Sequence, residues 1–196
     1  MKRLFDIVAS LVGVILLSPI FVLLAVWIKL DSKGPVFYLQ ERVGKNNKDF
    51  KIFKFRSMSV GSDKKGLITV GDHDPRVTKS GYYIRKFKLD EFPQLINVLI
   101  GNMSIVGPRP EVRKYVQLYN DEQLKVLNVK PGITDIASIK YRNENELLAA
   151  SENPDATYIN QIMPDKLKYN LEYIEKSSFL FDVKLVWLTF KEIISK

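Results

Sequence analysis

An unbroken run of uncharged residues near the start of the chain, residues 7–28, constrains its fold more than any other feature. A straight helix over this run would be about 33 Å long, which is enough to cross a bilayer core of ~30 Å. Pro19 lies near the centre of the run, where it removes a backbone donor and clashes with the preceding turn. Ser18 can donate a hydrogen bond to a carbonyl that the proline leaves free. The run therefore predicts two membrane-embedded helical arms, broken at Ser18 and Pro19, each too short to cross alone.

Basic residues flank this run on both sides, and basic flanks favour the cytosolic side of a membrane. A re-entrant hairpin over residues 1–30, which enters and leaves by the same leaflet, keeps both flanks in the cytosol. A single-pass anchor with a proline kink would leave one flank outside. A cleaved signal peptide would have a shorter apolar run, followed by a small-residue cleavage site. We expect the hairpin. The basic residues are Lys2, Arg3, Lys29, Lys33, Arg42, Lys45, Lys48, Lys51, Lys54 and Arg56.

Composition limits the chemistry of the remaining residues, 31–196, which are numerous enough for one domain with a core. The formal net charge of +8 implies an anionic partner, and anionic membrane lipids fit a membrane-attached domain. Nucleic acid is not expected, because the basic residues are spread along the chain. The chain has no cysteine, and its one histidine, His73, lies in a polar loop where we expect it to be solvated. Catalysis must therefore use carboxylates, basic groups or a carboxylate-bound cation.

The pattern along the chain predicts an α+β fold. Residues 36–39 and 50–55 have the composition of strands, and the polar residues 44–48 between them predict a hairpin loop. Helical apolar spacing occurs over residues 89–99, over the amphipathic segment 111–128 and over Phe179–Ile194. Trp187 lies beside lysines in the last of these, which suits an amphipathic helix in the membrane interface; packing in the core is the alternative. We expect a re-entrant membrane segment, a short β-hairpin and a helical catalytic domain with interfacial helices.

Asp90 and Glu91 are the strongest local candidates for catalysis. Pro93 suits a first helical turn, so the two carboxylates are expected at a helix N-terminus, which attracts anions such as phosphate. Adjacent carboxylates can hold a divalent cation, which offsets their repulsion of a phosphorylated substrate. One carboxylate is then able to attack phosphorus while the other holds the metal. The plainer alternative is that Asp90 caps the helix and Glu91 is a solvated first-turn acid.

Four basic residues are candidates for binding the substrate: Lys54, Arg56, Arg85 and Arg109. Arg109 lies in a rigid Pro-Arg-Pro elbow, and arginine at rigid positions suits bidentate phosphate contacts. The alternative for each arginine is a surface position or a buried ion pair. The chain has no glycine-rich nucleotide-binding loop, so a nucleotide would be held by other means.

Several segments occur in an order that matches a known family. They are Ser18-Pro19, GPVFYLQERVG at 34–44, KFRSM at 54–58, Arg85 ahead of LDEFPQL at 89–95, NVLIGNMSIVGPRP at 97–110, KPGIT at 130–134 and SFLFDVK at 178–184. On these segments the chain resembles the small monotopic phosphoglycosyl transferases, the bacterial sugar transferases that start glycan assembly. The resemblance covers nearly the whole chain, and the block from residue 89 to 110 is highly specific.

The resemblance implies a reaction. A UDP-sugar would bind with Mg²⁺, Asp90 would attack the β-phosphate, and UMP would leave a covalent phosphosugar on the enzyme. Undecaprenyl phosphate would then take the phosphosugar. Glu91 would ligate Mg²⁺, Arg85 would hold donor phosphate and Arg109 would help to bind the nucleotide. The location would be the cytosolic face of the bacterial inner membrane, and no oligomeric state is implied.

Two positions depart from the pattern common in that family. Asp135-Ile136-Ala137-Ser138 stands where members commonly have Gly, an aromatic residue, Ala and Gln, and Asn170 stands where members often have Asp. Both lie in the half of the chain that we associate with the shape of the donor. Two other functions remain open: an anchored glycosyltransferase that moves only the sugar, and a non-catalytic basic domain that binds anionic lipid.

Overall fold

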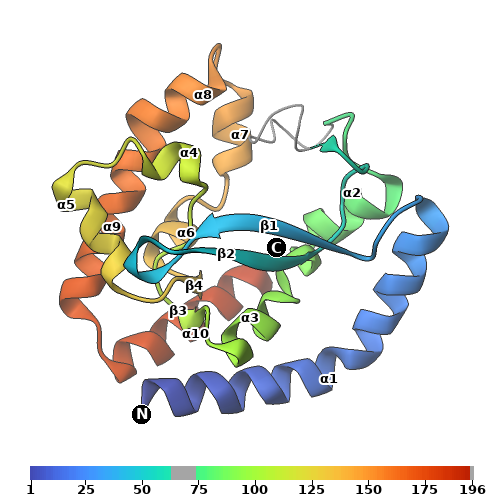
Figure 1. Cartoon of the computed structure of the whole chain (residues 1–196), viewed down its shortest axis with the longest axis horizontal. Coiled ribbons are helices and arrows are strands. Elements are labelled where there is room, and N and C mark those ends of the chain that lie inside the picture. The colour runs from blue at the N-terminus through green and yellow to red at the C-terminus, as the bar shows by residue number, and fades with distance from the viewer. Residues whose placement is uncertain (63–73, 195–196) are drawn as a thin grey trace.

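The computed structural model describes residues 1–62 and 74–194, and these form the α+β fold that the sequence predicts. His73, with the rest of residues 63–73, lies outside the described residues. Figure 1 shows a long bent helix, α1, running beneath and then up one side of a mainly helical body, with a two-stranded hairpin crossing its middle. The first elements are α1 (Lys2–Asp31), β1 (Phe37–Val43), η1 (Lys45–Asn47), β2 (Asp49–Phe55), α2 (Lys79–Lys86), η3 (Leu89–Glu91), α3 (Gln94–Ile100) and β3 (Ser104–Val106).

The second half of the chain consists of several short helices and two longer ones, α9 and α10. Its elements are α4 (Arg113–Val116), α5 (Asp121–Leu124), η4 (Lys125–Asn128), β4 (Gly132–Thr134), α6 (Ile136–Lys140), α7 (Glu144–Ala149), α8 (Pro154–Thr157), the π-helical turn η5 (Tyr158–Ile162), α9 (Met163–Lys176) and α10 (Phe179–Ile194).

Helix α1 is one continuous helix through Pro19, so the expected division into two arms is wrong. The helix bends partway along its length instead (Figure 1). Pro19 cannot donate to the carbonyl of Ile15, and the Ser18 hydroxyl donates to that carbonyl at 2.8 Å. The expected role of Ser18 is therefore confirmed. By length and apolar composition α1 is able to cross a membrane, and only 11% of its most apolar window is buried in the protein.

The two ends of α1 are both attached to the body of the protein. Its first turns contact α3 and β3. At its other end the Asp31 carboxylate accepts hydrogen bonds from the backbone N–H and hydroxyl of Ser80 at the start of α2. The apolar side chains of Leu24 and Ile28 pack there with Phe55 of β2 and Ile84 of α2. The helix therefore leaves the body in its middle and returns to it.

The β-hairpin forms where the sequence predicts it. Strands β1 and β2 pair antiparallel from Phe37↔Phe55 to Val43↔Asp49. The turn places Asn46 and Asn47 at φ 58° and 60°, a left-handed conformation that asparagine tolerates better than most residues. A second, parallel pair joins β3 to β4 in the register Ser104↔Gly132 and Val106↔Thr134.

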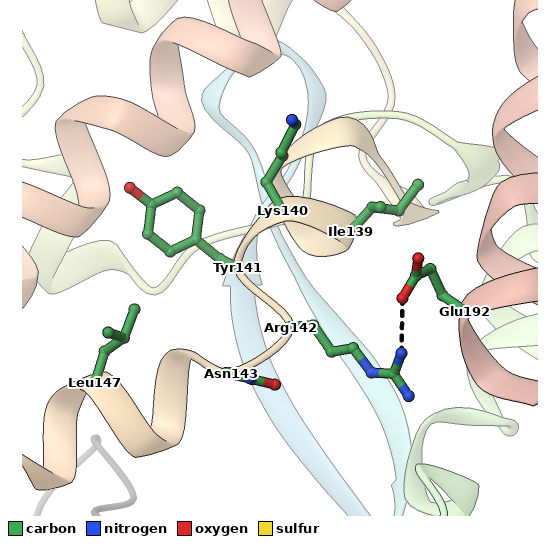
Figure 2. Close-up of a pocket in the computed structure, with 7 residues that line it drawn as sticks. All are labelled: Ile139, Lys140, Tyr141, Arg142, Asn143, Leu147 and Glu192. Carbon is green, nitrogen blue, oxygen red and sulfur yellow. Dashed lines mark hydrogen bonds and ion pairs between the residues drawn. The ribbon is translucent and has the colours of Figure 1, made fainter. Parts of the chain in front are cut away.

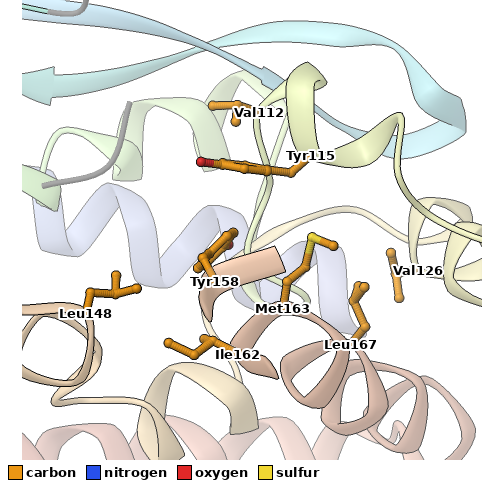
Figure 3. Close-up of a cluster of buried hydrophobic side chains, with 8 residues drawn as sticks. All are labelled: Val112, Tyr115, Val126, Leu148, Tyr158, Ile162, Met163 and Leu167. Atoms are coloured by element: carbon orange, nitrogen blue, oxygen red, sulfur yellow. The ribbon is translucent and has the colours of Figure 1, made fainter. Parts of the chain in front are cut away.

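The segment 111–128 is amphipathic as predicted but is not one helix. It forms α4, α5 and the 3₁₀ turn η4, because Asn120 and Gln123 make a capping box that starts a new helix. Its apolar face is nevertheless buried as the pattern predicts. Figure 3 shows Val112, Tyr115 and Val126 packed in one cluster with side chains of α7, η5 and α9: Leu148, Tyr158, Ile162, Met163 and Leu167.

The terminal helix α10 has the bounds that the sequence predicts. Leu185 is buried against β3 and α9, whereas Trp187 is 61% exposed and Leu180 is 80% exposed. The Lys191 ammonium lies 5.6 Å from the centre of the Trp187 ring. The alternative that Trp187 packs in the core is therefore wrong. Phe179 at the start of α10 contacts Phe5 of α1, which makes the apolar faces of the two helices neighbours.

Candidate active site

The acidic pair lies in the 3₁₀ turn η3, between α2 and α3, and not in the first turn of α3. Helix α3 begins at Gln94 with Pro93 as its N-cap, and no side chain caps it. The N-cap of η3 is Lys88, again without a side-chain cap. The interpretation that Asp90 caps a helix is therefore wrong. The pair still lies in the first turn of a helical segment, because Phe92 and Pro93 keep helical backbone angles between η3 and α3.

Arg109 forms an ion pair with Glu91. Its guanidinium donates to both carboxylate oxygens of Glu91, Nη1 to Oε2 at 3.1 Å and Nη2 to Oε1. Its backbone N–H donates to the buried carboxylate of Asp135 at 2.9 Å. The arginine is therefore fixed at its backbone and at its side chain.

The elbow that carries Arg109 depends on a close backbone contact. A Cβ on Gly132 would lie 2.1 Å from the backbone nitrogen of Gly107, and one on Gly107 would lie 2.6 Å from the carbonyl oxygen of Lys130. Only glycine permits this approach of the residue 107 and 132 backbones. Pro108 and Pro110 flank Arg109 and restrict the chain further.

Lys54 completes a cationic surround for Glu91. It lies near the end of β2, and its Nζ is 3.8 Å from Glu91 Oε1. Burial lowers the pKa of Lys54 to about 8, against the opposing effect of the Glu91 charge. The pKa of Lys54 is therefore close enough to neutral pH for a small rise in pH to remove its charge.

The two carboxylates of the pair are in different electrostatic states. Burial and the Glu91 charge raise the pKa of Asp90, although Lys54, Arg85 and Arg109 oppose this. Burial also acts to raise the pKa of Glu91, but Arg109 and Lys54 together outweigh it and hold that pKa well below its usual range. Within residues 1–62 and 74–194, Asp90 has no hydrogen bond or ion pair, whereas Glu91 has both. Asp90 is therefore a carboxylate without a partner beside one that is fully engaged.

The two remaining basic candidates, Arg85 and Arg56, lie in different parts of the structure. Arg85 lies in the last turn of α2, where its charge acts on Asp90. Arg56 is buried and donates to the carbonyls of Ile28, Ser32 and Lys33 at the C-terminal end of α1. The structure therefore brings Lys54, Arg85 and Arg109 to the acidic pair, and gives Arg56 contacts with the end of α1.

Asp135 belongs to this site, although its sequence pattern was not interpreted as part of it. Its Oδ2 accepts the Arg109 N–H, and its Oδ1 accepts the N–H of Ser138 as the N-cap of α6. The signal was present in the sequence, because an Asp directly after the Pro-Gly-Ile-Thr turn is a typical helix start.

A pocket of about 460 Å³ lies at the other end of α6. Figure 2 shows Tyr141 and Leu147 on one side of the loop that follows α6, and Arg142 on the other, donating to Glu192 at 2.7 Å. Helix α6 has five residues and is about 7.5 Å long. The pocket is therefore about one short helix away from Asp135 and the Arg109 backbone.

The two carboxylates of Asp90 and Glu91 suit Mg²⁺ better than a metal ion that takes all of its ligands from the protein. No group of three or more acidic or histidine side chains able to hold a metal occurs in the described part of the chain. Mg²⁺ usually keeps several waters and takes one or two carboxylates together with substrate phosphates. Asp90 and Glu91 supply that number of carboxylates. Both oxygens of Glu91 already accept from Arg109, so a cation bound there would share these oxygens with Arg109 or displace it.

The sequence as a whole matches the model of one known family. The chain belongs to the bacterial sugar transferases, whose family model matches residues 1–196.

Among its relatives is the UDP-glucose:undecaprenyl-phosphate glucose-1-phosphate transferase of Escherichia coli (strain K12), 41% identical over all of this chain and 41% of the relative. Another is the UDP-N-acetylgalactosamine-undecaprenyl-phosphate N-acetylgalactosaminephosphotransferase of Aeromonas hydrophila, 40% identical over 99% of this chain and 44% of the relative. The chain thus spans less than half the length of these two proteins. It covers 83% of the exopolysaccharide production protein ExoY of Rhizobium meliloti, at 32% identity over 96% of this chain.

Proposed function

We propose that this protein transfers a sugar phosphate from a UDP-sugar to undecaprenyl phosphate through a covalent intermediate on Asp90. The observation that carries the proposal is the contrast within the acidic pair: Asp90 has no described partner, while Glu91 is paired with Arg109 and Lys54. A nucleophile has to be free to reach its substrate. Two relatives that match along nearly all of this chain are named as sugar phosphotransferases that act on undecaprenyl phosphate.

The first step is a displacement at the β-phosphorus of the donor. An Asp90 carboxylate oxygen forms a bond to phosphorus, the bond from that phosphorus to the bridging oxygen breaks, and UMP leaves with the electron pair. In the second step an oxygen of undecaprenyl phosphate attacks the same phosphorus, and the bond to Asp90 breaks. The raised pKa of Asp90 makes its carboxylate a stronger nucleophile than an ordinary one once it is ionised.

The cations of the site have separate tasks in this scheme. Lys54 and Arg85 offset the negative charge of the two carboxylates and the donor phosphates. Arg109 neutralises Glu91 before the donor binds, and once released it can donate to phosphate with its bidentate fork. Mg²⁺, held by Glu91, would supply further neutralisation of phosphate charge. The pocket beyond α6 lies about one short helix from Asp135, which holds the Arg109 backbone, and is our candidate for one end of the nucleotide sugar.

We further propose that α1 is re-entrant and that both of its ends lie on the cytosolic face of the inner membrane. Two matched contacts support this: Asp6 near the start of α1 accepts from Ser104, and Asp31 at its end accepts from Ser80. Both serines belong to the body, so a helix with its two ends across a bilayer would lose one of these contacts. The exposed apolar residues of α10, Leu180, Trp187 and Phe190 among them, would lie in the interface with anionic lipids.

Intact mass spectrometry tests the covalent step. Incubation of the purified chain with a panel of UDP-sugars and Mg²⁺, without lipid, should release about one equivalent of UMP and leave the corresponding sugar phosphate as added mass. Undecaprenyl phosphate should discharge the adduct. Asp90→Asn should give neither adduct nor turnover, with thermal unfolding unchanged as the control for folding.

The other outcomes identify the rival functions. Release of UDP in place of UMP would establish a glycosyltransferase that moves only the sugar. Salt-sensitive binding to anionic vesicles, with no UMP or UDP released from any donor, would establish a lipid-binding domain. An active Asp90→Asn variant would defeat the assignment of the nucleophile.

A further inference from the structure

The first turns of α1 carry three charged side chains, and all of them bond to elements that lead to the candidate site. Asp6 is 3% exposed, and its carboxylate accepts from the Ser104 hydroxyl at 2.9 Å and from the Ile105 N–H at 3.0 Å. Both residues belong to β3. A buried carboxylate with two such donors is a strong attachment, because charged hydrogen bonds are stronger than neutral ones.

Lys2 attaches the end of the same strand. Its ammonium donates to the Val106 carbonyl at 2.9 Å and pairs with the buried carboxylate of Asp182. The Tyr173 hydroxyl also donates to Asp182, at 2.6 Å. Val106 is the last residue of β3, and Arg109 follows three residues later through the restricted Gly107-Pro108 backbone. A shift of β3 would therefore be passed on to Arg109.

Arg3 attaches α3, the helix that follows the acidic pair. Its guanidinium donates to the carbonyls of Val98 at 2.6 Å and Leu99 at 3.0 Å, in the last turn of α3. Helix α3 has seven residues and is about 10 Å long. It starts three residues after Glu91, so a movement of its C-terminal end would tilt the turn that holds the acidic pair.

Glu91 and Arg109 thus meet from two elements that are both held by the start of the membrane helix. We propose that Arg3 and Asp6 are positioning residues for the catalytic centre: Arg3 fixes α3 behind the acidic pair, and Asp6 fixes β3 ahead of Arg109. The inference rests on the proposed function. It makes the seating of α1 part of the active-site geometry, and not only a means of attachment to the membrane.

A double-mutant cycle tests this inference. The first half-reaction is measured as UMP release in nanodiscs for Asp6→Asn, Arg109→Lys and the double variant. If Asp6 acts through Arg109, Asp6→Asn should lower kcat/KM about tenfold in the native background and less than ~3-fold in the Arg109→Lys background.

Asp31→Asn is the matched control. Asp31 also accepts from a serine hydroxyl and a backbone N–H, but at the other end of α1. Its effect should be the same, within about twofold, in both backgrounds. Ser104→Ala is the second variant, to be used if Asp6→Asn does not fold, because it removes one of the donors to Asp6 and leaves the charge in place.

The outcomes separate the inference from the proposed function. A native chain that forms no phosphosugar adduct would defeat the proposed function. A native chain that forms the adduct, with Asp6→Asn and Ser104→Ala either active as the native chain or additive with Arg109→Lys like the control, would overturn the positioning role.

Discussion

Within the acidic pair, neighbouring residues of similar chemistry are given different tasks by their surroundings. Glu91 faces Arg109 and Lys54, which stabilise its charge, whereas Asp90 is desolvated beside the charge of Glu91. Desolvation and a like charge raise a carboxyl pKa, and opposite charges lower it. This contrast supports our proposal that Asp90 is the nucleophile and that Glu91 exchanges Arg109 for Mg²⁺.

The pKa of Lys54 predicts a pH dependence. Because burial lowers this pKa to about 8, the ammonium is charged below pH 8 and neutral above it. The positive charge favours binding of the anionic donor, so kcat/KM for UMP release should fall as the pH rises through 8. Lys54→Arg should remove this alkaline limb, because arginine stays charged throughout the range. A limb that persists unchanged in Lys54→Arg would assign it to another group.

Glu91→Gln should lower activity about 100-fold and raise the Mg²⁺ concentration needed for half-maximal rate, because an amide is a poorer ligand and no longer attracts Arg109. Titration of Mg²⁺ against UMP release measures both effects. Arg85→Lys should also be strongly impaired, since lysine keeps the charge but loses the bidentate fork. Near-native rates in both variants would leave these residues with structural roles only.

Among the elements, the bend in α1 and the elbow at Gly107 place the reactive groups. The bend lets both ends of a 30-residue helix reach the same body, and the elbow brings Arg109 across to Glu91. The apolar face of α10 lies next to that of α1 through the Phe5–Phe179 contact. These elements together put the site beside the surface that we assign to the membrane.

Pro19→Ala should straighten α1, because alanine restores the hydrogen bond to Ile15 and removes the clash. A straighter helix would strain the contacts at its two ends, so UMP release and thermal stability should both fall. Ser18→Ala is the matched variant: it leaves the bend but removes the hydroxyl that donates to Ile15, and should cost about 1 kcal/mol in stability. Native activity and stability in Pro19→Ala would show that the bend is set by the body alone.

For the whole molecule, the decisive prediction is that the start of α1 and the catalytic body share one side of the membrane. The chain has no cysteine, so single cysteines at Lys2 and at the exposed Glu152 report without background. Both should resist a membrane-impermeant thiol reagent in intact cells and react after permeabilisation. Labelling of the Lys2 position alone in intact cells would establish a spanning anchor and contradict the re-entrant topology.

Local patterns were sufficient to predict much of this protein. The apolar run, the hairpin and α10 follow from hydrophobic periodicity and turn residues, which act over short distances along the chain. The acidic pair and its basic candidates were predicted from their types and their order, and the structure brings Lys54, Arg85 and Arg109 close to the pair. The Ser18 hydrogen bond followed from the proline next to it.

Tertiary contacts decided the rest. The helix expected over 89–99 starts later, and the segment 111–128 divides into three short pieces, because packing and a capping box override periodicity. Arg56 was expected at the substrate and instead contacts the end of α1, since only the fold brings residues 28–33 to its guanidinium. The pairing of Glu91 with Arg109, and of Arg109 with Asp135, joins residues 18 and 26 positions apart. The sequence determined which groups this protein carries, and the tertiary structure decided which of them are paired and which is left free, because charge and burial depend on neighbours distant in the chain.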